Sequence, residues 1–312
     1  MSGKQQEKNP KVLITGGSGL IGRYLTSVLL SEGYNVSHLS RRQDQFGRVR
    51  VYRWDPARKI IDPLILEGID YIIHLAGANM GEKRWTQKRR EEIIKSRIET
   101  AGLLFKTITD NRILLKAFIS ASAIGYYGMV TSDRIFNEND PPAEDFLGNT
   151  CRLWEESADQ FKTIGIRTVK IRTAVVLEKN EGVLARLLPH TRAGIFPILG
   201  NGRQYMPWIH IKDLCNIYMR AIRDEKMEGV YNASAPDHVT YRDFMKTLSQ
   251  VITKPFFHPP VPSLVLRTLK GEMSDMILKG SRISPEKIIN TGYQFVFDNL
   301  HDALRELITP GK

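Results

Sequence analysis

Three glycines with the spacing of a phosphate-binding loop follow a short apolar run at residues 11–15, which has the composition of a β-strand. Gly16 permits a tight turn, Gly19 lets the backbone approach a pyrophosphate, and Gly22 lets a helix pack closely on the strand. The helix expected after the turn would offer free N–H groups and a partial positive charge to phosphates. The run therefore predicts a dinucleotide-binding loop made of Gly16, Gly17, Ser18, Gly19, Leu20, Ile21 and Gly22.

The end of the next predicted strand, residues 35–40, indicates which dinucleotide is bound. NAD sites usually place an acidic residue about 20 residues after the loop, where it bonds the ribose hydroxyls. Here that position reads Ser40, Arg41 and Arg42, and the nearest acid is Asp44. A carboxylate repels a 2′-phosphate, whereas guanidinium groups hold it in bidentate fashion. We therefore expect these three residues to contact the cofactor, with NADP(H) favoured over NAD(H); the alternative is a solvated arginine loop.

A further cofactor contact is expected at Asp55, which ends the third predicted strand in the sequence Trp-Asp-Pro. Its carboxylate could accept a hydrogen bond from the adenine amino group. An Asp-Pro pair is an equally good turn starter, so both roles stay open.

Strands alternate with helices through the first half of the chain. Residues 11–15, 35–40, 48–54, 70–76, 115–122 and 167–177 read as strands, and residues 86–109 and 147–164 read as helices with one apolar face. This alternation predicts an α/β fold, a Rossmann-type doubly wound parallel sheet, with a smaller C-terminal α/β substrate lobe. We expect a disordered tail at 1–10, the NADP(H)-binding domain at 11–178, with later returns of the chain to its sheet, and the smaller lobe at 179–312.

The composition is that of an ordinary globular chain of 312 residues with 42% hydrophobic and 25% charged residues. Two cysteines and scattered histidines exclude a disulfide framework and predict no metal site. No signal peptide and no run of about 18 apolar residues occur, so we expect a cytoplasmic protein that does not enter membranes.

The formal net charge is +11, and residues 41–59 hold seven basic and two acidic residues. The cofactor phosphate accounts for part of this excess. Nucleic-acid binding is a weaker alternative, because the charge is accompanied by no recognised nucleic-acid motif.

Several motifs together resemble the extended, nucleotide-sugar-epimerase-like form of the short-chain dehydrogenase/reductase superfamily. They are TGGSGLIG, HLAG (74–77), FISASAIGYYG (118–128), ENDPP (138–142) and MPWIHIKDL (206–214). WDP, RWTQKRREEIIKSRIET (84–100), CRLWEESA (151–158) and the tail at 271–295 are similar to an atypical branch called NAD-dependent epimerase or "epimerase family". In that branch a small domain of unknown function follows, here at about 258–308.

The resemblance implies a catalytic apparatus that this chain carries only in part. In the superfamily a Ser, a Tyr-x-x-x-Lys pair and an upstream Asn transfer the proton while hydride passes to or from the nicotinamide. Ser122 matches the serine, but the Tyr and Lys positions fall on Leu147 and Cys151, and Arg97 takes the place of the Asn. Cys151 lies on the apolar stripe of its helix, which favours a buried hydrophobe over a nucleophile, although a cofactor-facing role remains open.

Tyr126 and Tyr127 could replace the missing acid, because they follow Ser122 just beyond a strand end, where ligands bind in such sheets. Packing at the strand end is the equally good alternative. The resemblance further implies that the cofactor is lined by Leu75, Ala76, Glu92, Arg97 and Leu177, with Arg97 contacting a phosphate or the ribose.

These observations predict an NADP(H)-dependent oxidoreductase or nucleotide-sugar-epimerase-like enzyme acting on a small polar metabolite. The missing Tyr and Lys support a different alternative, an NADP(H)-binding module that senses redox state or assists assembly without turnover. The sequence names neither the substrate nor the oligomeric state.

Overall fold

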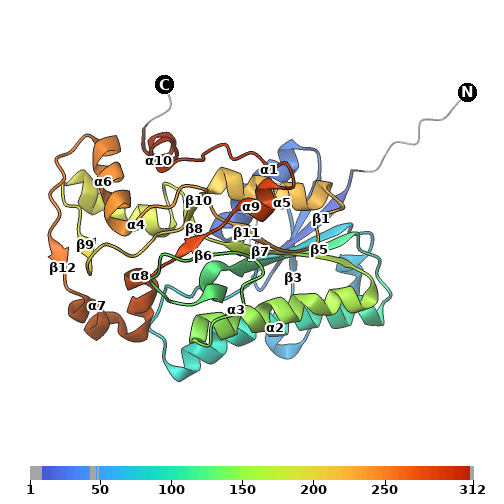
Figure 1. Cartoon of the computed structure of the whole chain (residues 1–312). Coiled ribbons are helices and arrows are strands. Elements are labelled where there is room, and N and C mark those ends of the chain that lie inside the picture. Colours follow the sequence, from blue (N-terminus) through green and yellow to red (C-terminus); the bar gives the residue numbers. More distant parts are fainter. Residues whose placement is uncertain (1–8, 43–46, 48, 310–312) are drawn as a thin grey trace, which may run out of the picture.

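The computed structural model describes residues 9–42, 47 and 49–309. Its centre is a parallel seven-stranded sheet with the strand order β11-β7-β5-β4-β1-β2-β3 (Figure 1). The strands are β1 (Lys11–Thr15), β2 (Asn35–Ser40), β3 (Arg50–Arg53), β4 (Tyr71–His74), β5 (Ala117–Ala123), β7 (Arg167–Thr173) and β11 (Gly229–Ala233). The predicted doubly wound α/β fold is therefore confirmed. Most of the predicted tail, residues 1–8, lies outside the described part.

Helices cover both faces of this sheet because successive strand residues point to opposite sides. Val12 and Ile14 pack on the face covered by α1 (Leu20–Ser31) and α5 (Ile211–Arg223). Leu13 packs on the other face, in the core that α2 (Gln87–Asp110) helps to build. In Figure 1, α2 and α3 (Phe146–Asp159) run side by side beneath the sheet, and these two helices are in contact.

Both helices predicted from the apolar spacing are present, and polar caps fix where they begin. The hydroxyl of Thr86 accepts a hydrogen bond from the N–H of Arg89 (3.2 Å), and the carboxylate of Asp145 accepts one from the N–H of Gly148 (2.8 Å). Such caps satisfy the free N–H groups of a first turn. α3 ends earlier than predicted, and residues 160–164 continue it as a 3-10 helix.

The prediction of a single strand over 167–177 is wrong in one respect. The structure has two strands there, β7 and β8 (Val175–Leu177), separated by Ala174. The N–H of Ala174 still bonds to Ala233 on β11, whereas the N–H of Val175 bonds to Pro207. β8 therefore leaves the central sheet and pairs with β10 (Trp208–His210). The change of partner is a long-range event that an apolar run cannot reveal.

The remaining elements build a second lobe with its own core, which includes Leu184, Trp208, Phe244 and Leu304. Its core is built by α4 (Gly182–Arg192), β9 (Ile198–Leu199), α6 (Tyr241–Ile252) and α10 (Leu300–Ile308). Between α6 and α10 lie β12 (Pro260–Val261), α7 (Ser263–Lys270), α8 (Asp275–Leu278), β13 (Arg282–Ile283) and α9 (Glu286–Ile289). Of these, α9 packs against β11 of the central sheet. β12 pairs with β9, and β13 pairs with β6 (Ile135–Phe136). The chain also returns to the central fold through α5 and β11.

The buried carboxylate of Asp213 ties the C-terminal part of the chain to α5. It accepts hydrogen bonds from the hydroxyl of Tyr293 (2.7 Å) and from the N–H groups of Val296 (2.8 Å) and Phe297 (3.0 Å). A charge-assisted bond of this kind is stronger than a neutral one, so Asp213 acts as a fixed clamp.

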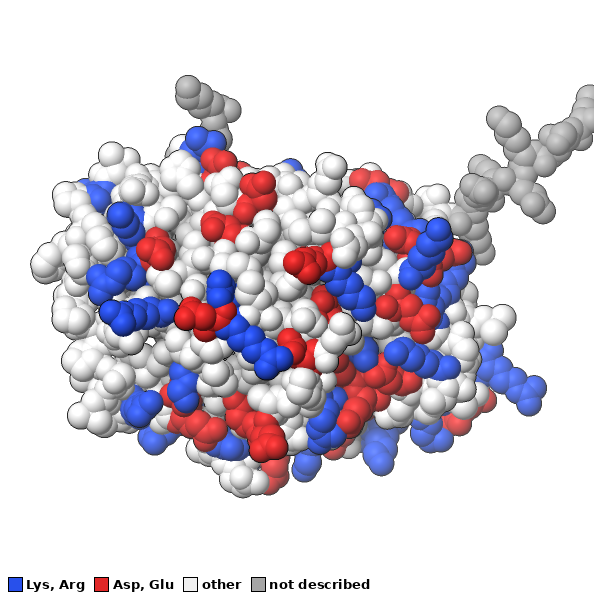
Figure 2. Space-filling view, in the orientation of Figure 1, with Lys and Arg blue, Asp and Glu red and all other residues white. Residues whose placement is uncertain are grey.

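Within the described residues, none of the helices is both long and apolar enough to cross a membrane. The same residues contain no cluster of His, Cys, Asp or Glu that could hold a metal ion. On the face shown in Figure 2, acidic and basic side chains are interspersed rather than separated by sign.

Candidate functional site

The glycine loop joins β1 to α1 at the carboxyl edge of the sheet. Gly16 has φ +73°, and a Cβ atom there would lie 3.0 Å from the backbone of Leu75 and Ala76. A Cβ on Gly22 would lie 2.6 Å from the carbonyl oxygen of Gly16. Gly19 stands at the N-cap of α1, and no side chain caps this end of the helix. The first-turn N–H groups are therefore left to a ligand, an arrangement that fits the pyrophosphate of a dinucleotide.

Two buried histidines, which the sequence analysis did not single out, support this loop. His38 is hydrogen-bonded through Nε2 to the hydroxyl of Thr26 (2.8 Å), and its ring packs directly against Gly17. His74 at the end of β4 bonds the hydroxyl of Thr15 (2.8 Å), the last residue of β1. Burial lowers the pKa of each histidine to about 4, so both rings are neutral at pH 7.

Acidification is expected to destabilise the protein through these histidines. Their pKa is about 4 in the folded state and 6.5 in the unfolded chain. Between these values the unfolded state binds more protons, so stability is complete above pH 6.5 and falls as the pH is lowered towards 4. The loss is at most roughly 3 kcal/mol per histidine.

Urea unfolding between pH 7.5 and pH 4 measures this loss of stability. His74→Asn should reduce the pH dependence, whereas His301→Asn, at an exposed position, should not; equal slopes would contradict this cause.

The residues expected at the 2′-phosphate lie at the carboxyl end of β2. Arg41 and Arg42 are both exposed, and the N–H of Arg42 donates to the hydroxyl of Ser40 (3.1 Å). Both arginines therefore lie at the surface, at the end of the strand β2 that neighbours β1, the strand leading into the glycine loop. Asp55 accepts a hydrogen bond from the N–H of Arg58 (3.2 Å) and caps a 3-10 turn. Of its two predicted roles, the structure shows the turn.

The other expected cofactor contacts lie in different surroundings. The exposed carboxylate of Glu92 bonds Nη1 of Arg89 (2.7 Å), which lowers the pKa of Glu92. Leu75 and Ala76 directly follow β4 and border Gly16, while Leu177 is buried at the end of β8. The structure thus brings Leu75 and Ala76 to the glycine loop.

Ser122 is bound within a buried ion pair. It lies opposite Arg172 in the register of β5 and β7, and its hydroxyl donates to Oε1 of Glu155 on α3 (2.7 Å). Arg172 donates to both oxygens of the same carboxylate, from Nε (2.7 Å) and from Nη2 (3.0 Å). Burial opposes the charge of Arg172, but the hydrogen bond and charge of Glu155 outweigh it and raise the pKa of the guanidinium. Glu155 and Arg172 are residues of the candidate site that the sequence analysis missed.

The two candidate tyrosines differ in their surroundings. Tyr127 is buried; its hydroxyl donates to Oδ1 of Asn232 (2.7 Å) and accepts a hydrogen bond from Nη1 of Arg172 (2.9 Å). Tyr126 is half-buried, and the guanidinium carbon of Arg172 lies 3.4 Å from the centre of its ring. Burial raises the pKa of both tyrosines above the ordinary value of 10. The hydroxyl of Tyr127 is therefore already hydrogen-bonded in the interior, whereas Tyr126 is the tyrosine that retains access to solvent.

The positions of the missing Tyr and Lys are filled by buried apolar groups. Leu147 and Cys151 lie on α3 beneath Gly125, and burial raises the pKa of the Cys151 thiol to about 12. A thiol with this pKa is neutral at pH 7 and a poor nucleophile. Arg97, also buried, donates to the carbonyl oxygens of Ile93 (2.9 Å) and Ala78 (3.1 Å). Burial lowers the pKa of Arg97 to about 10, so it remains charged at neutral pH.

Comparison with known proteins agrees with this architecture. The model of the NAD dependent epimerase/dehydratase family matches residues 12–234, and that of a domain of unknown function, DUF1731, matches residues 261–307. The chain belongs to the NAD dependent epimerase/dehydratase family. The epimerase family protein YfhF of Bacillus subtilis is 34% identical over 305 residues, which cover 96% of this chain and 99% of that protein. The predicted resemblance is thereby confirmed.

Two solved structures are similar over nearly the whole chain. The human epimerase family protein SDR39U1, isoform 2, with NADPH has a TM-score of 0.84 and 32% identity, and the match covers 95% of this chain and 98% of the human chain. The nucleoside-diphosphate sugar epimerase of Corynebacterium glutamicum has a TM-score of 0.77 and 30% identity over 96% of this chain and 58% of its own.

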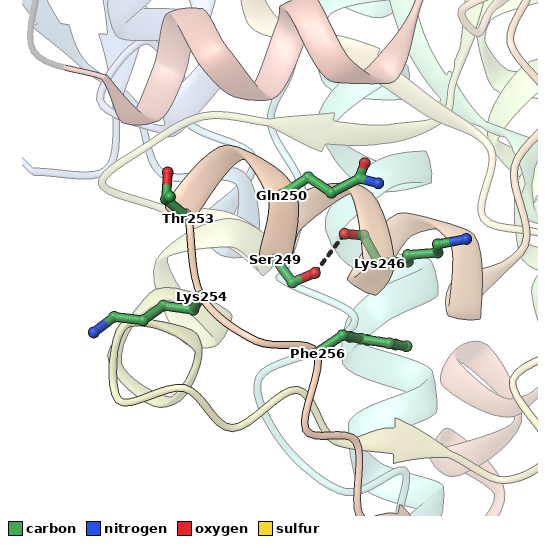
Figure 3. A pocket seen from close by; sticks show the side chains of 6 residues that line it. All are labelled: Lys246, Ser249, Gln250, Thr253, Lys254 and Phe256. Carbon is green, nitrogen blue, oxygen red and sulfur yellow. Dashed lines mark hydrogen bonds between the residues drawn. The ribbon is translucent and has the colours of Figure 1, made fainter.

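A surface pocket of about 480 Å³ opens on the second lobe (Figure 3). Lys246, Ser249, Gln250, Thr253, Lys254 and Phe256 line it, and all of them belong to α6 or the loop that follows. In Figure 3 the hydroxyl of Ser249 turns back to the carbonyl oxygen of Lys246 (2.7 Å). Because none of its lining residues belongs to the glycine loop, β5 or α3, we do not assign the cofactor or its substrate to this pocket.

Proposed function

We propose that this protein binds NADP(H) in preference to NAD(H) and uses it as an oxidoreductase or epimerase-like enzyme. Its substrate would be a small metabolite with a polar carbonyl or hydroxyl group. The proposal is carried by one observation: an uncapped helix N-terminus behind the glycine loop lies beside a strand end where two exposed arginines replace the usual acid. The NADPH-bound human relative supports the same cofactor.

In this proposal Tyr126 would donate the proton to the carbonyl oxygen of the substrate, while a bound nicotinamide would supply hydride to the carbonyl carbon. In the reverse direction the Tyr126 phenolate would accept the proton as hydride returns to the nicotinamide. Because burial raises the pKa of Tyr126, its phenol stays protonated at neutral pH and can act as an acid. The guanidinium of Arg172 over its ring would stabilise the phenolate after proton transfer. Glu155 holds this guanidinium in place by accepting two hydrogen bonds from it, and the hydroxyl of Ser122 in turn donates to Glu155.

Exchanging both Arg41 and Arg42 for alanine is expected to weaken NADPH binding by at least about 100-fold, because each of the two charge-assisted bonds to the phosphate contributes roughly 1.5–3 kcal/mol. NADH lacks the 2′-phosphate, so its binding should change by less than about threefold. Fluorescence titrations with NADPH and with NADH measure the two affinities. Arg58→Ala removes an exposed arginine of the neighbouring turn and serves as the control for general charge. An equal loss for NADPH and NADH would refute the assignment.

A second candidate, a cofactor-binding module without turnover, is favoured by the bonding of Ser122. Its hydroxyl hydrogen is directed to Glu155, and Leu147 and Cys151 leave no tyrosine–lysine pair beside it. Such a module would sense the redox state or assist assembly.

Tyr126→Phe distinguishes the two candidates. If Tyr126 is the acid, the variant should retain NADPH affinity and lose hydride transfer by about 100-fold, in line with general acid catalysis. NADPH oxidation at 340 nm with a panel of carbonyl compounds and sugar nucleotides is the measurement. Tyr24→Phe, an exposed tyrosine on α1, is the control. Binding without turnover by the wild type across the panel would favour the module.

A further inference from the structure

The segment of residues 263–279, here called the α7–α8 segment, begins with a helix that is only loosely packed. None of the residues of α7 is buried, and Leu264 and Leu269 are 71% and 69% exposed. Large apolar side chains on a helix gain little where they contact water. The segment is therefore not held by α7, and its attachment must come from the residues that follow.

Met273 provides the apolar attachment of this segment. It is buried in a small cluster with Trp85, Ile93 and Leu147. Ala78, Met80, Met129 and Phe146 are partly buried against this cluster. The ring of Trp85 meets that of Phe146 edge to face at 4.8 Å. The cluster is thus lined by thioethers and aromatic rings, which adapt to ligands of irregular shape.

The cluster lies where a ligand beside the cofactor would sit. Ala78 and Met80 follow β4, Met129 follows β5, and Leu147 stands in the first turn of α3. Leu147 also packs against Gly125, next to the candidate acid Tyr126. β4 neighbours β1, whose carboxyl end carries the glycine loop. Ligands of doubly wound sheets bind at this edge.

The α7–α8 segment is bound to the second lobe at both ends and at Ile277, whose carbonyl oxygen accepts a hydrogen bond from Nε2 of Gln204 (3.0 Å). β12 pairs with β9 before it, and after it the N–H of Tyr205 bonds to the carbonyl oxygen of Gly280 (3.2 Å). Between these points an ion pair of Arg90 with Glu272 accompanies Met273. A half-exposed ion pair contributes little to stability, so Met273 can leave its place while both ends of the segment stay bound.

We infer that Met273 occupies the subsite for an apolar, ring-shaped group of the substrate, and that the α7–α8 segment moves to admit it. This inference rests on the proposed function: the polar carbonyl of the substrate faces Tyr126, and its apolar group takes the place of Met273 between Trp85 and Leu147. A pocket of this kind opens only when the ligand replaces the side chain that fills it. The substrate class is therefore an aromatic or similarly flat apolar carbonyl compound or alcohol.

Binding of 1-naphthaldehyde to the NADPH-loaded full chain tests this inference, with D-glyceraldehyde as the polar comparison. Met273→Ala should bind 1-naphthaldehyde about tenfold more tightly, because the buried side chain no longer competes for the subsite. Leu264→Ala, on the exposed face of the same segment, should bind like the wild type. Quenching of tryptophan fluorescence gives the dissociation constants. Trypsin cleavage after Arg267 should accelerate when 1-naphthaldehyde binds, because the segment is released.

Equal affinity of Met273→Ala and Leu264→Ala for 1-naphthaldehyde would overturn the inference. If Met273→Ala does not fold, Ala78→Leu decides instead: it adds bulk to the same cluster and should weaken binding about tenfold. NADPH titration of the same preparations separates the two proposals. Loss of NADPH binding in the wild type would overturn the proposed function, whereas equal affinities of the two variants for 1-naphthaldehyde, with NADPH binding intact, would overturn the subsite alone.

Discussion

Replacing Arg172 with alanine is expected to lower the free energy of unfolding by about 3–5 kcal/mol, because it leaves a buried carboxylate without its cation. Glu155 accepts two hydrogen bonds from Arg172 and one from Ser122, and all three residues are buried. Lys170, with Nζ 4.0 Å from Glu155, is already bound to Asp159 (2.5 Å) and compensates only in part. Denaturant unfolding of the variant and the wild type measures the difference.

Two further variants distinguish the effect of breaking the ion pair from the effect of removing any arginine. Arg152→Ala removes a half-exposed arginine of α3 that bonds Glu156 (2.6 Å), and it should cost less than about 1 kcal/mol. Changing Glu155 and Arg172 together to methionine removes both charges and should recover much of the stability, because no buried charge then lacks a partner. A loss for Arg172→Ala as small as that for Arg152→Ala would show that the pair is not essential to the fold.

The parts of the fold that could be predicted from sequence are those that local spacing determines. Ile94, Ile98 and Ala101 recur every three or four residues, and this period predicts the helix α2. The face that α2 buries is rotated from this stripe: it includes Ile93 and Leu104, whereas Ile94 and Ile98 are half-buried. The glycine loop is equally local, since three glycines and the strand before them lie within a dozen residues. Its identification needed no knowledge of the tertiary structure.

The residues that could not be predicted are those whose partners are distant in the chain. Glu155 and Arg172 lie on a helix and a strand, and only the packing of α3 on β5 and β7 brings them to Ser122. The clamp of Asp213 joins groups more than 80 residues apart. Met273 joins a cluster at α2 and α3 from the C-terminal segment. None of these contacts leaves a periodic pattern in the sequence.

Gly22→Ala is expected to abolish tight NADPH binding, with a loss of about 100-fold or more. The new Cβ would lie 2.6 Å from the carbonyl oxygen and Cα of two backbone groups, Gly16 and Gly17, so the loop itself must shift. The N–H groups at the start of α1 then no longer point to the pyrophosphate. Losing one or two charge-assisted bonds of roughly 1.5–3 kcal/mol each gives this factor. Fluorescence titration with NADPH measures the affinity.

Two other glycine substitutions make this prediction specific. A Cβ on Gly19 meets only the carbonyl oxygen of Gly16, at 3.3 Å, so Gly19→Ala should weaken NADPH binding less than Gly22→Ala. Gly102, inside α2, has no atom within 4 Å of such a Cβ, and Gly102→Ala should leave NADPH binding unchanged while stabilising the helix by about 1 kcal/mol. We expect the NADPH affinities of the three variants to follow the space that is available for the new Cβ atom at each glycine. Unchanged NADPH affinity in Gly22→Ala would mean that the dinucleotide does not bind at this loop, and the proposed function would fall with it.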